Sequence, residues 1–155
     1  MNLKKFTATK HSDRTAAIPC PELAEFFKPG ETPELTVRGL TAEESMICNE
    51  APKRDEQTAA LAEALAAGNK EAAAEVTKAL GISGKQTPAQ YSRFLSLVII
   101  GSVAPKFDRP AAIHLAKNYP NLFMLAAMKV LELTGLNRVP GKLPGSGETI
   151  ESASL

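Results

Sequence analysis

Two histidines and two cysteines are the side chains in this sequence best suited to metal binding. His11, Cys20, Cys48 and His114 lie far apart along the chain. Structural zinc sites usually contain pairs of ligands only a few residues apart, and no such pair occurs here. The spacing therefore argues against a zinc site, and no metal or other cofactor is expected.

A nucleophile built from Cys48 and His114 is the second catalytic possibility. An activated cysteine normally lies beside basic residues that stabilise its thiolate, and no local pattern marks Cys48 in this way. Cys48 is therefore interpreted as a small buried hydrophobic residue. Glu43 and Glu44 are adjacent and point in different directions on a helix, so they form a poor catalytic carboxylate pair. Their position at an expected helix N-terminus explains both.

The segment 135–142, GLNRVPGK, resembles a phosphate-binding loop only in part. Five residues separate its glycines where the motif requires four, and Leu143 replaces the hydroxyl that binds magnesium. The segment also follows an expected helix, whereas a phosphate-binding loop follows a strand. The sequence therefore predicts no nucleotide site.

The N-terminal segment is basic. It carries four basic residues and one aromatic ring: Lys4, Lys5, Lys10, Arg14 and Phe6. Proteins that bind single-stranded nucleic acid use several stacking aromatic side chains, so this segment is interpreted as a solvated arm. The net charge of +1 likewise argues against duplex nucleic acid or an anionic membrane as partner, because both attract dense basic surfaces.

The composition fits one cytoplasmic domain. Its 155 residues can bury a core without metal or disulfide support, and two distant cysteines suit a reducing compartment. No apolar run follows the basic N-terminus, so a secretory signal is not expected. The longest apolar run, Phe94 to Ala104, is shorter than the roughly 20 residues that cross a bilayer.

The stretch from Tyr91 to Ala104 is expected to form the central helix, because it is apolar on nearly every side. Thr87 is the expected N-cap, Pro88 suits the first turn, and Pro105 marks the end. A strand over Leu97 to Ile100 is the alternative for so short an apolar run. The predicted core is centred on four residues: Phe94, Leu95, Val98 and Ile99.

The part of the chain before this helix is expected to contain a minor β element. Residues 1–18 are predicted to be a flexible arm with at most one short extended piece, and Leu23, Phe26 and Phe27 share one face of a short helix or turn. Leu35 to Arg38 alternates apolar and polar residues and is predicted to be a half-buried strand. Its partner must come from the N-terminal segment or from another copy of the protein.

Three helical segments are predicted between this strand and the central helix. Their expected ranges are Ala42 to about Asn49, Asp55 to Ala67 and Lys70 to Leu80. Thr41 and Glu44 form a capping box at the first, and Pro52 interrupts the chain before the second. The residues expected to cap the second and third are Gly68, Asn69 and Gly81.

Two helices are predicted after the central one, over Ala111 to Lys117 and Asn121 to Thr134. Asp108 caps the first, and Gly135 ends the second. Apolar or long side chains recur at turn spacing in the last helix: Leu122, Leu125, Ala126, Met128 or Lys129, and Leu133. Residues 136–155 are predicted to be a disordered tail. The expected fold is therefore mainly α: a compact helical domain over residues 19–135 with a minor N-terminal β-strand or hairpin element and disordered termini.

Three stretches carry a family likeness through their order. They are LTVRGLTAEE at 35–44 followed by Asn49-Glu50, HLAKNYPNLF at 114–123, and KVLELTG at 129–135. In the order of these features the chain resembles the tail assembly chaperones of long-tailed bacteriophages and prophages. The features are a strand, a helix that starts at RGLT, Ala-rich helices, a break at YP and an end at LTG. The resemblance covers roughly residues 20 to 145.

This resemblance implies a non-catalytic, mainly helical protein that oligomerises. It implies binding to the tape measure protein before the tail tube polymerises on it, in the cytoplasm of the bacterial host during virion morphogenesis. The tail tube protein is a second implied partner, and the chaperone is absent from the mature virion. No catalytic, cofactor-binding or metal residue is carried over. The helices alone equally fit a helical adaptor or a nucleic-acid-binding regulatory protein, which remain the alternatives.

In the same family a programmed ribosomal frameshift often appends a second domain to a longer product. Gly141-Lys142 lies after the last predicted helix, where an appended domain would follow a flexible linker. Glycine and lysine codons can together spell a slippery run. A plain disordered end is the alternative, and the coding DNA distinguishes the two.

Overall fold

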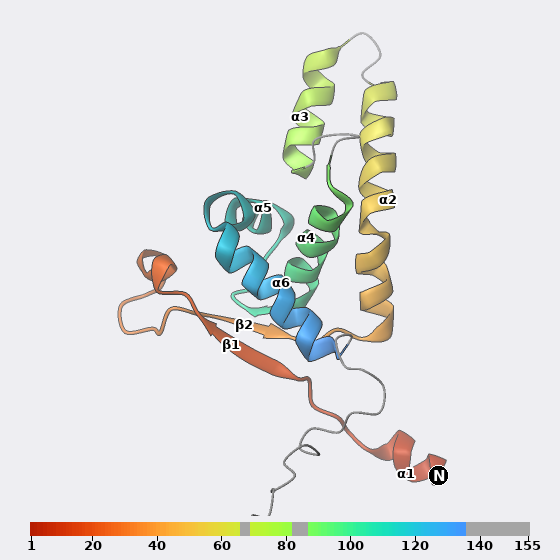
Figure 1. Cartoon of the computed structure of the whole chain (residues 1–155), viewed down its shortest axis with the longest axis vertical. Helices are drawn as coiled ribbons and strands as arrows, with labels where there is room; N and C mark the ends of the chain where they lie inside the picture. The colour runs from red at the N-terminus through yellow and green to blue at the C-terminus, as the bar shows by residue number, and fades with distance from the viewer. Residues whose placement is uncertain (66–68, 82–86, 136–155) are drawn as a thin grey trace, which may run out of the picture.

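The computed structural model describes residues 1–65, 69–81 and 87–135. The chain is mainly helical and carries a small three-stranded antiparallel sheet, which confirms the expected fold class (Figure 1). The elements are α1 (Leu3–Ala8), β1 (Thr15–Pro19), the 3₁₀ helix η1 (Pro21–Phe26), β2 (Glu34–Arg38), α2 (Ala42–Leu65), α3 (Lys70–Leu80), α4 (Ala89–Gly101), β3 (Ser102–Ala104), α5 (Arg109–Asn118) and α6 (Pro120–Thr134).

The sheet has β2 at its centre, with β1 and β3 on either side. Ala16 of β1 pairs with Val37 of β2, and Thr36 pairs with Ala104 of β3. The predicted strand near Leu35 to Arg38 is therefore confirmed, and of its two expected sources of a partner the N-terminal segment supplies one. The inward-facing side of the sheet is covered by α4 and α6.

The prediction that residues 1–18 are mostly unstructured is wrong for the parts that form α1 and β1. Asn2 caps α1 by accepting a hydrogen bond from the Lys5 amide at 3.1 Å. β1 forms because Ile18 buries its side chain against the core while the strand pairs with β2. Such pairing joins distant segments, so local periodicity does not reveal it.

The prediction that Pro52 separates two helices is also wrong, because α2 runs without a break from Ala42 to Leu65. A proline removes one hydrogen bond and strains the preceding turn. Burial of one face of α2 offsets this cost, since α2 packs along α4. That face consists of Cys48, Ala51, Asp55, Ala59 and Ala62, all buried. α3 lies beside the far half of α2 as the expected hairpin (Figure 1).

The central helix α4 is shorter than predicted. It begins after Pro88, the N-cap, one residue later than the Thr87 cap predicts, and it ends at Gly101, well before Pro105. The Cβ that a side chain at Gly101 would add lies 2.5 Å from Val130 Cγ2, so α4 and α6 approach each other closely here. The following residues leave the helix because the free edge of β2 pairs with β3.

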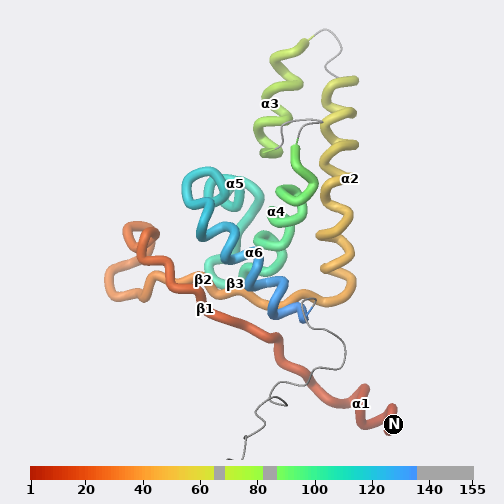
Figure 2. The backbone as a smooth tube through the Cα atoms, in the orientation of Figure 1, coloured from red at the N-terminus to blue at the C-terminus, as the bar shows by residue number. Residues whose placement is uncertain are grey.

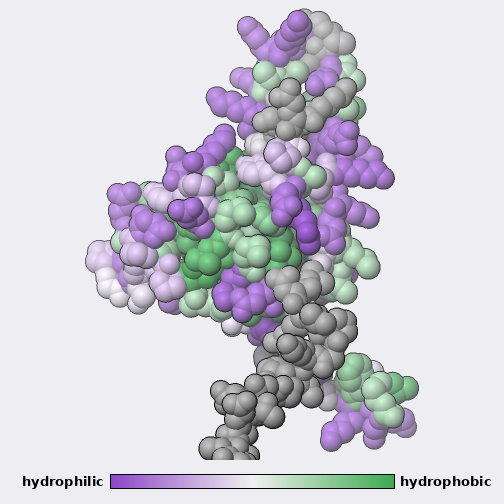
Figure 3. Space-filling view, in the orientation of Figure 1, coloured by the Kyte–Doolittle hydropathy of each residue, from purple (hydrophilic) through white to green (hydrophobic). Residues whose placement is uncertain are grey.

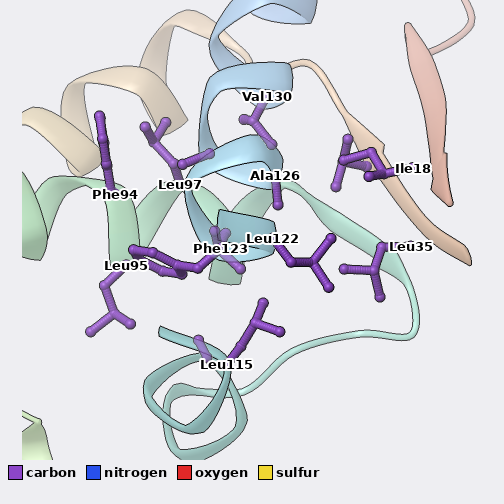
Figure 4. Packing of buried hydrophobic residues seen from close by; sticks show 14 of the residues in the cluster. Ile18, Leu35, Phe94, Leu95, Leu97, Leu115, Leu122, Phe123, Ala126 and Val130 are labelled. Atoms are coloured by element: carbon purple, nitrogen blue, oxygen red, sulfur yellow. The ribbon is translucent and has the colours of Figure 1, made fainter. Parts of the chain in front are cut away.

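The core lies between α4, α6 and the sheet. Phe94, Leu95 and Val98 are buried as predicted, whereas Ile99 is only partly buried and Leu97 takes a fully buried place. Figure 4 shows side chains from α4, α5, α6 and the sheet converging on one cluster. On α6 the buried stripe is Leu122, Phe123, Ala126, Ala127, Val130 and Leu131.

Leu125 and Met128, two of the residues that recur at turn spacing in the last helix, are exposed. The helix turns the Phe123, Ala127 and Val130 side toward its neighbours. Leu125 and Met128 therefore point away from the core. The helix presents them on its outer face.

The predicted helix caps inside the described residues are confirmed, apart from Thr87. The Thr41 amide donates to Glu44 Oε2 at 2.9 Å and the Glu44 amide donates to Thr41 Oγ1 at 3.2 Å, which is the capping box. Asn69 and Asp108 accept from the amides of Ala72 and Ala111, and Gly81 and Gly135 end their helices in the left-handed conformation. The predicted cap at Gly68 and the predicted tail at 136–155 lie outside the described residues.

Candidate partner-binding groove

An apolar groove of about 750 Å³ opens between η1, β2, the β3–α5 connection and α5. Its residues are Leu23, Phe26, Phe27, Glu31, Thr32, Glu34, Leu35, Thr36, Ala104, Pro105, Phe107, Ala111, His114, Leu115 and Tyr119. This volume falls within the range of sites that bind small molecules or anchor side chains of a partner. We treat this groove as the candidate functional site.

Buried aliphatic side chains form the floor of the groove. Leu23, Leu35 and Leu115 contribute to the core and are each less than a tenth exposed. Partly buried aromatic rings stand around them, and Phe26 at the edge remains 66% exposed. A large aromatic side chain left this exposed beside an apolar hollow is a typical anchor for a partner.

The sequence builds one wall of the groove from a turn and a short helix. Pro21 starts η1, where a missing amide hydrogen has no cost. Gly30, with φ of +89°, reverses the chain after η1, and the Lys28 amide donates to Glu31 Oε2 at 3.2 Å to close that turn. The turn brings β2 back alongside η1, so Phe27 and Leu35 line the same hollow.

The opposite wall is fixed by hydrogen bonds after β3. The Phe107 amide donates to Ser102 Oγ at 3.0 Å, and Lys106 Nζ donates to the carbonyl oxygens of Ile100 and Ser102. These bonds fold the β3–α5 connection back over the end of α4. Phe107 is thereby held at the groove.

The polar groups of the groove are few and stand at its rim. Glu31 and Glu34 supply negative charge, and His114 supplies an imidazole from α5. The His114 side chain is exposed on α5. A mostly apolar hollow with an acidic rim is suited to an apolar segment that carries basic residues nearby.

A second apolar surface lies on the outer side of α6. Met124, Leu125 and Met128 are between 44% and 51% exposed, and Figure 3 shows hydrophobic residues gathered over α6 on the viewed face. Methionine side chains adapt their shape to different partners. This surface therefore offers a flexible contact close to the core helices.

The residues that could do chemistry are not gathered at the groove. Cys20 and Cys48 are fully buried, and burial raises the pKa of the Cys48 thiol to about 11 and also raises the pKa of Cys20. A raised pKa is the opposite of what a nucleophilic thiol needs. His11 lies with Phe6 near the N-terminus, at a ring distance of 6.5 Å. In the described ranges, no three His, Cys, Asp or Glu side chains cluster closely enough to hold a metal ion.

The groove was not predicted from the sequence. Phe26 and Phe27 were expected on one helical face with Leu23, but Phe26 at the end of η1 is 66% exposed, whereas Leu23 is buried and Phe27 packs against the core. Phe107, between Lys106 and Asp108, was given no role, and Tyr119 was named only as part of the YP break. Aromatic residues beside turns were the available signal, since such residues often mark an exposed contact.

Comparison with protein-family models, curated proteins and solved structures gives no match to the chain. Across residues 1–65, 69–81 and 87–135, no helix has the length and apolar character that crossing a bilayer requires. The fold and the groove are thus the observations on which a functional proposal must rest, together with the sequence resemblance.

Proposed function

We propose that this protein is a phage tail assembly chaperone whose groove binds an apolar helical segment of the tape measure protein. The observation that carries the proposal is the groove of about 750 Å³ with its exposed Phe26. A long tape measure protein needs its apolar segments covered until the tail tube forms around it. Covering them requires an apolar hollow and no catalytic group.

The stretches that resemble the family meet in space, which supports the proposal. The first contributes Leu35 and Thr36 to the groove, and the second contributes His114, Leu115 and Tyr119. Two stretches that lie far apart in the sequence therefore line the same groove.

The third stretch holds the first in place. The Leu40 amide donates to Thr134 Oγ1 at 3.0 Å. A side chain at Gly39 would place its Cβ 2.6 Å from the Leu133 carbonyl oxygen, so only glycine fits this crossing. The stretches that carry the resemblance thus form one connected unit around the start of α2.

The proposed chaperone acts in the host cytoplasm, forms a homo-oligomer, contacts the tail tube protein as well, and leaves before the virion is complete. Co-expression with the tape measure protein of the same phage tests this function. The tape measure protein should become more soluble and co-purify with the chaperone. An unchanged insoluble fraction together with no complex would contradict the proposal and favour an adaptor or regulator.

A frameshifted longer product is part of the proposal for the gene. Gly141-Lys142 lies outside the described residues, and α6 already ends at Thr134. A second domain would then join the chain after the core is complete. Slippery codons at 141 and 142 with an overlapping downstream frame support two products, and codons that cannot slip exclude this site.

A further inference from the structure

The N-terminal helix α1 has no buried residue. Leu3 and Phe6 are 63% and 58% exposed, and Figure 1 shows α1 standing apart from the helical body. Leu3 and Phe6 are three positions apart, so they lie on one face of the helix. We call Met1–Ala8 the arm. Because no residue of α1 is buried among the residues that the structure describes, its apolar face is available for another surface.

In the described part of the chain the outer edge of β1 is also open, since β1 pairs with β2 alone there. The Gly39 amide donates to the Arg14 carbonyl, and the Cys20 amide donates to the Pro33 carbonyl. Hydrogen-bonded pairs alternate in an antiparallel ladder, so the amides of Thr15 and Ala17 point away from β2. Pro19 also faces outward, where its missing amide hydrogen does not disturb the sheet.

We propose that two copies of the chain pair through their β1 edges, antiparallel about Ala17, and that the arm of each copy docks on the groove of the other. Each Ala17 would donate to and accept from Ala17 of the second copy, and each Thr15 amide would donate to the Pro19 carbonyl opposite. This arrangement gives four backbone hydrogen bonds and joins the two sheets into one of six strands.

The antiparallel register brings the arm to the groove. In one copy the arm precedes β1, and in the other copy η1 follows β1. With Ala17 opposite Ala17, positions 3–8 of one chain run past positions 26–31 of the other, where Phe26 is exposed. The connection 9–14 can extend over roughly 20 Å, which leaves the arm room to cross from the strand edge to the groove. Within one copy, β1 instead separates α1 from η1, which lie at its opposite ends (Figure 2).

The two surfaces have opposite charge. The arm and its connection carry three lysines, Lys4, Lys5 and Lys10. The groove and η1 carry four glutamates: Glu22, Glu25, Glu31 and Glu34. A basic amphipathic helix is thus the occupant that this acidic, apolar groove fits best.

The inference does not rest on the proposed function, because it concerns the purified chain alone. If both hold, the arm covers the groove until a tape measure segment displaces it. The two ideas are distinguished as follows: loss of the contact between arm and groove with tape measure binding retained overturns the inference alone, whereas loss of tape measure binding with that contact retained overturns the proposed function alone.

Cross-linking between differently tagged copies tests the arm. Full-length chains with Leu3→Cys are mixed with chains carrying Phe26→Cys and treated with a short bismaleimide, while native Cys20 and Cys48 are protected by burial. The expected product is a mixed dimer. In the matched control Leu61→Cys replaces Phe26→Cys; Leu61 is a similarly exposed position of α2 (59% against 66%), and this variant should give at least tenfold less product. Equal yields with both acceptors would overturn arm docking.

Sedimentation equilibrium of Ala17→Pro tests the strand edge. This change removes an amide that points away from β2, so β1–β2 pairing is retained while two of the four new bonds are lost. Self-association should weaken about 10- to 100-fold, and the control Ala17→Thr, which keeps the amide, should associate like the wild type. The proposal would be overturned if Ala17→Pro dimerised like the wild type, or if the wild type stayed monomeric at micromolar concentration. It would also be overturned if a chain carrying both Leu3→Cys and Phe26→Cys cross-linked only within itself.

Discussion

The Arg38 guanidinium donates two hydrogen bonds to the Glu44 carboxylate, from Nη2 to Oε1 at 2.6 Å and from Nη1 to Oε2 at 2.9 Å. Arg38 ends β2 and Glu44 lies in the first turn of α2. The same carboxylate accepts the Thr41 amide of the capping box. One acidic side chain therefore fixes the angle at which the sheet passes into the longest helix of the described chain.

Replacing Glu44 with Gln should lower the free energy of unfolding by about 1 to 2 kcal/mol at pH 7, since the cap is weakened and the ion pair is lost. The bond with Arg38 lowers the pKa of Glu44 to about 2 from 4.5. A lowered folded pKa stabilises the protein above pH 4.5, and this contribution fades as the pH falls toward 2. Urea unfolding at pH 7 and pH 3 should thus show a smaller difference between variant and wild type at pH 3. A difference that does not shrink would contradict the role of the charge.

A buried ion pair ties α5 to the α2–α3 hairpin. Arg109 Nη2 lies 3.1 Å from both Asp55 oxygens, and Arg109 Nε donates to the Leu80 carbonyl at 2.8 Å. Asp55→Asn should cost about 2 to 3 kcal/mol, because the guanidinium loses its charged partner in a mostly buried place. Glu132→Gln, which removes the exposed pair with Lys129, is the control and should cost at most about 0.5 kcal/mol. Equal effects in chemical denaturation would show that the Asp55 pair is not structural.

Val98 is 1% exposed in the middle of α4. Val98→Asp buries a carboxylate without a partner and should lower stability by at least about 4 kcal/mol. Val76→Asp, at a 44% exposed position of α3, should cost below about 1 kcal/mol. Thermal melting followed by circular dichroism compares them, and a Val98→Asp variant that melts like the wild type would show that α4 is misplaced.

Both cysteines should resist modification in the folded protein. A thiol with a pKa of about 11 instead of 9.0, as at Cys48, holds about a hundredfold less thiolate at pH 8. Burial adds a steric barrier. Titration with a chromogenic disulfide reagent should therefore detect almost no thiol before urea is added and two thiols per chain afterwards. Rapid reaction of either cysteine in native buffer would contradict the described packing.

Local signals in the sequence predicted the helix ends well. Thr41 with Glu44, Asn69, Asp108 and Gly135 act within a few residues of themselves, and the structure uses each as expected. Their chemistry depends on neighbouring backbone groups, so no knowledge of the tertiary fold is needed.

Features that depend on distant contacts were missed. Pro52 stays helical because α4 buries one face of α2, and Ser102 to Ala104 turn into a strand because β2 offers a free edge. The groove was missed for the same reason: Leu23, Leu35 and Leu115 come together only after the sheet and α5 have formed. The hydrophobic periodicity within one segment does not reveal such contacts between distant segments.

The most direct test of the groove as the binding site is co-purification of the tape measure protein with two matched variants. Phe26→Asp places a charge at the groove edge, and Leu61→Asp places one at a similarly exposed position of α2, with exposures of 66% and 59%. We predict that Phe26→Asp recovers at least about tenfold less tape measure protein than the wild type, as expected for the loss of an aromatic anchor. Leu61→Asp should recover the wild-type amount. Equal recovery with both variants would contradict the groove as the site where this chain holds its partner.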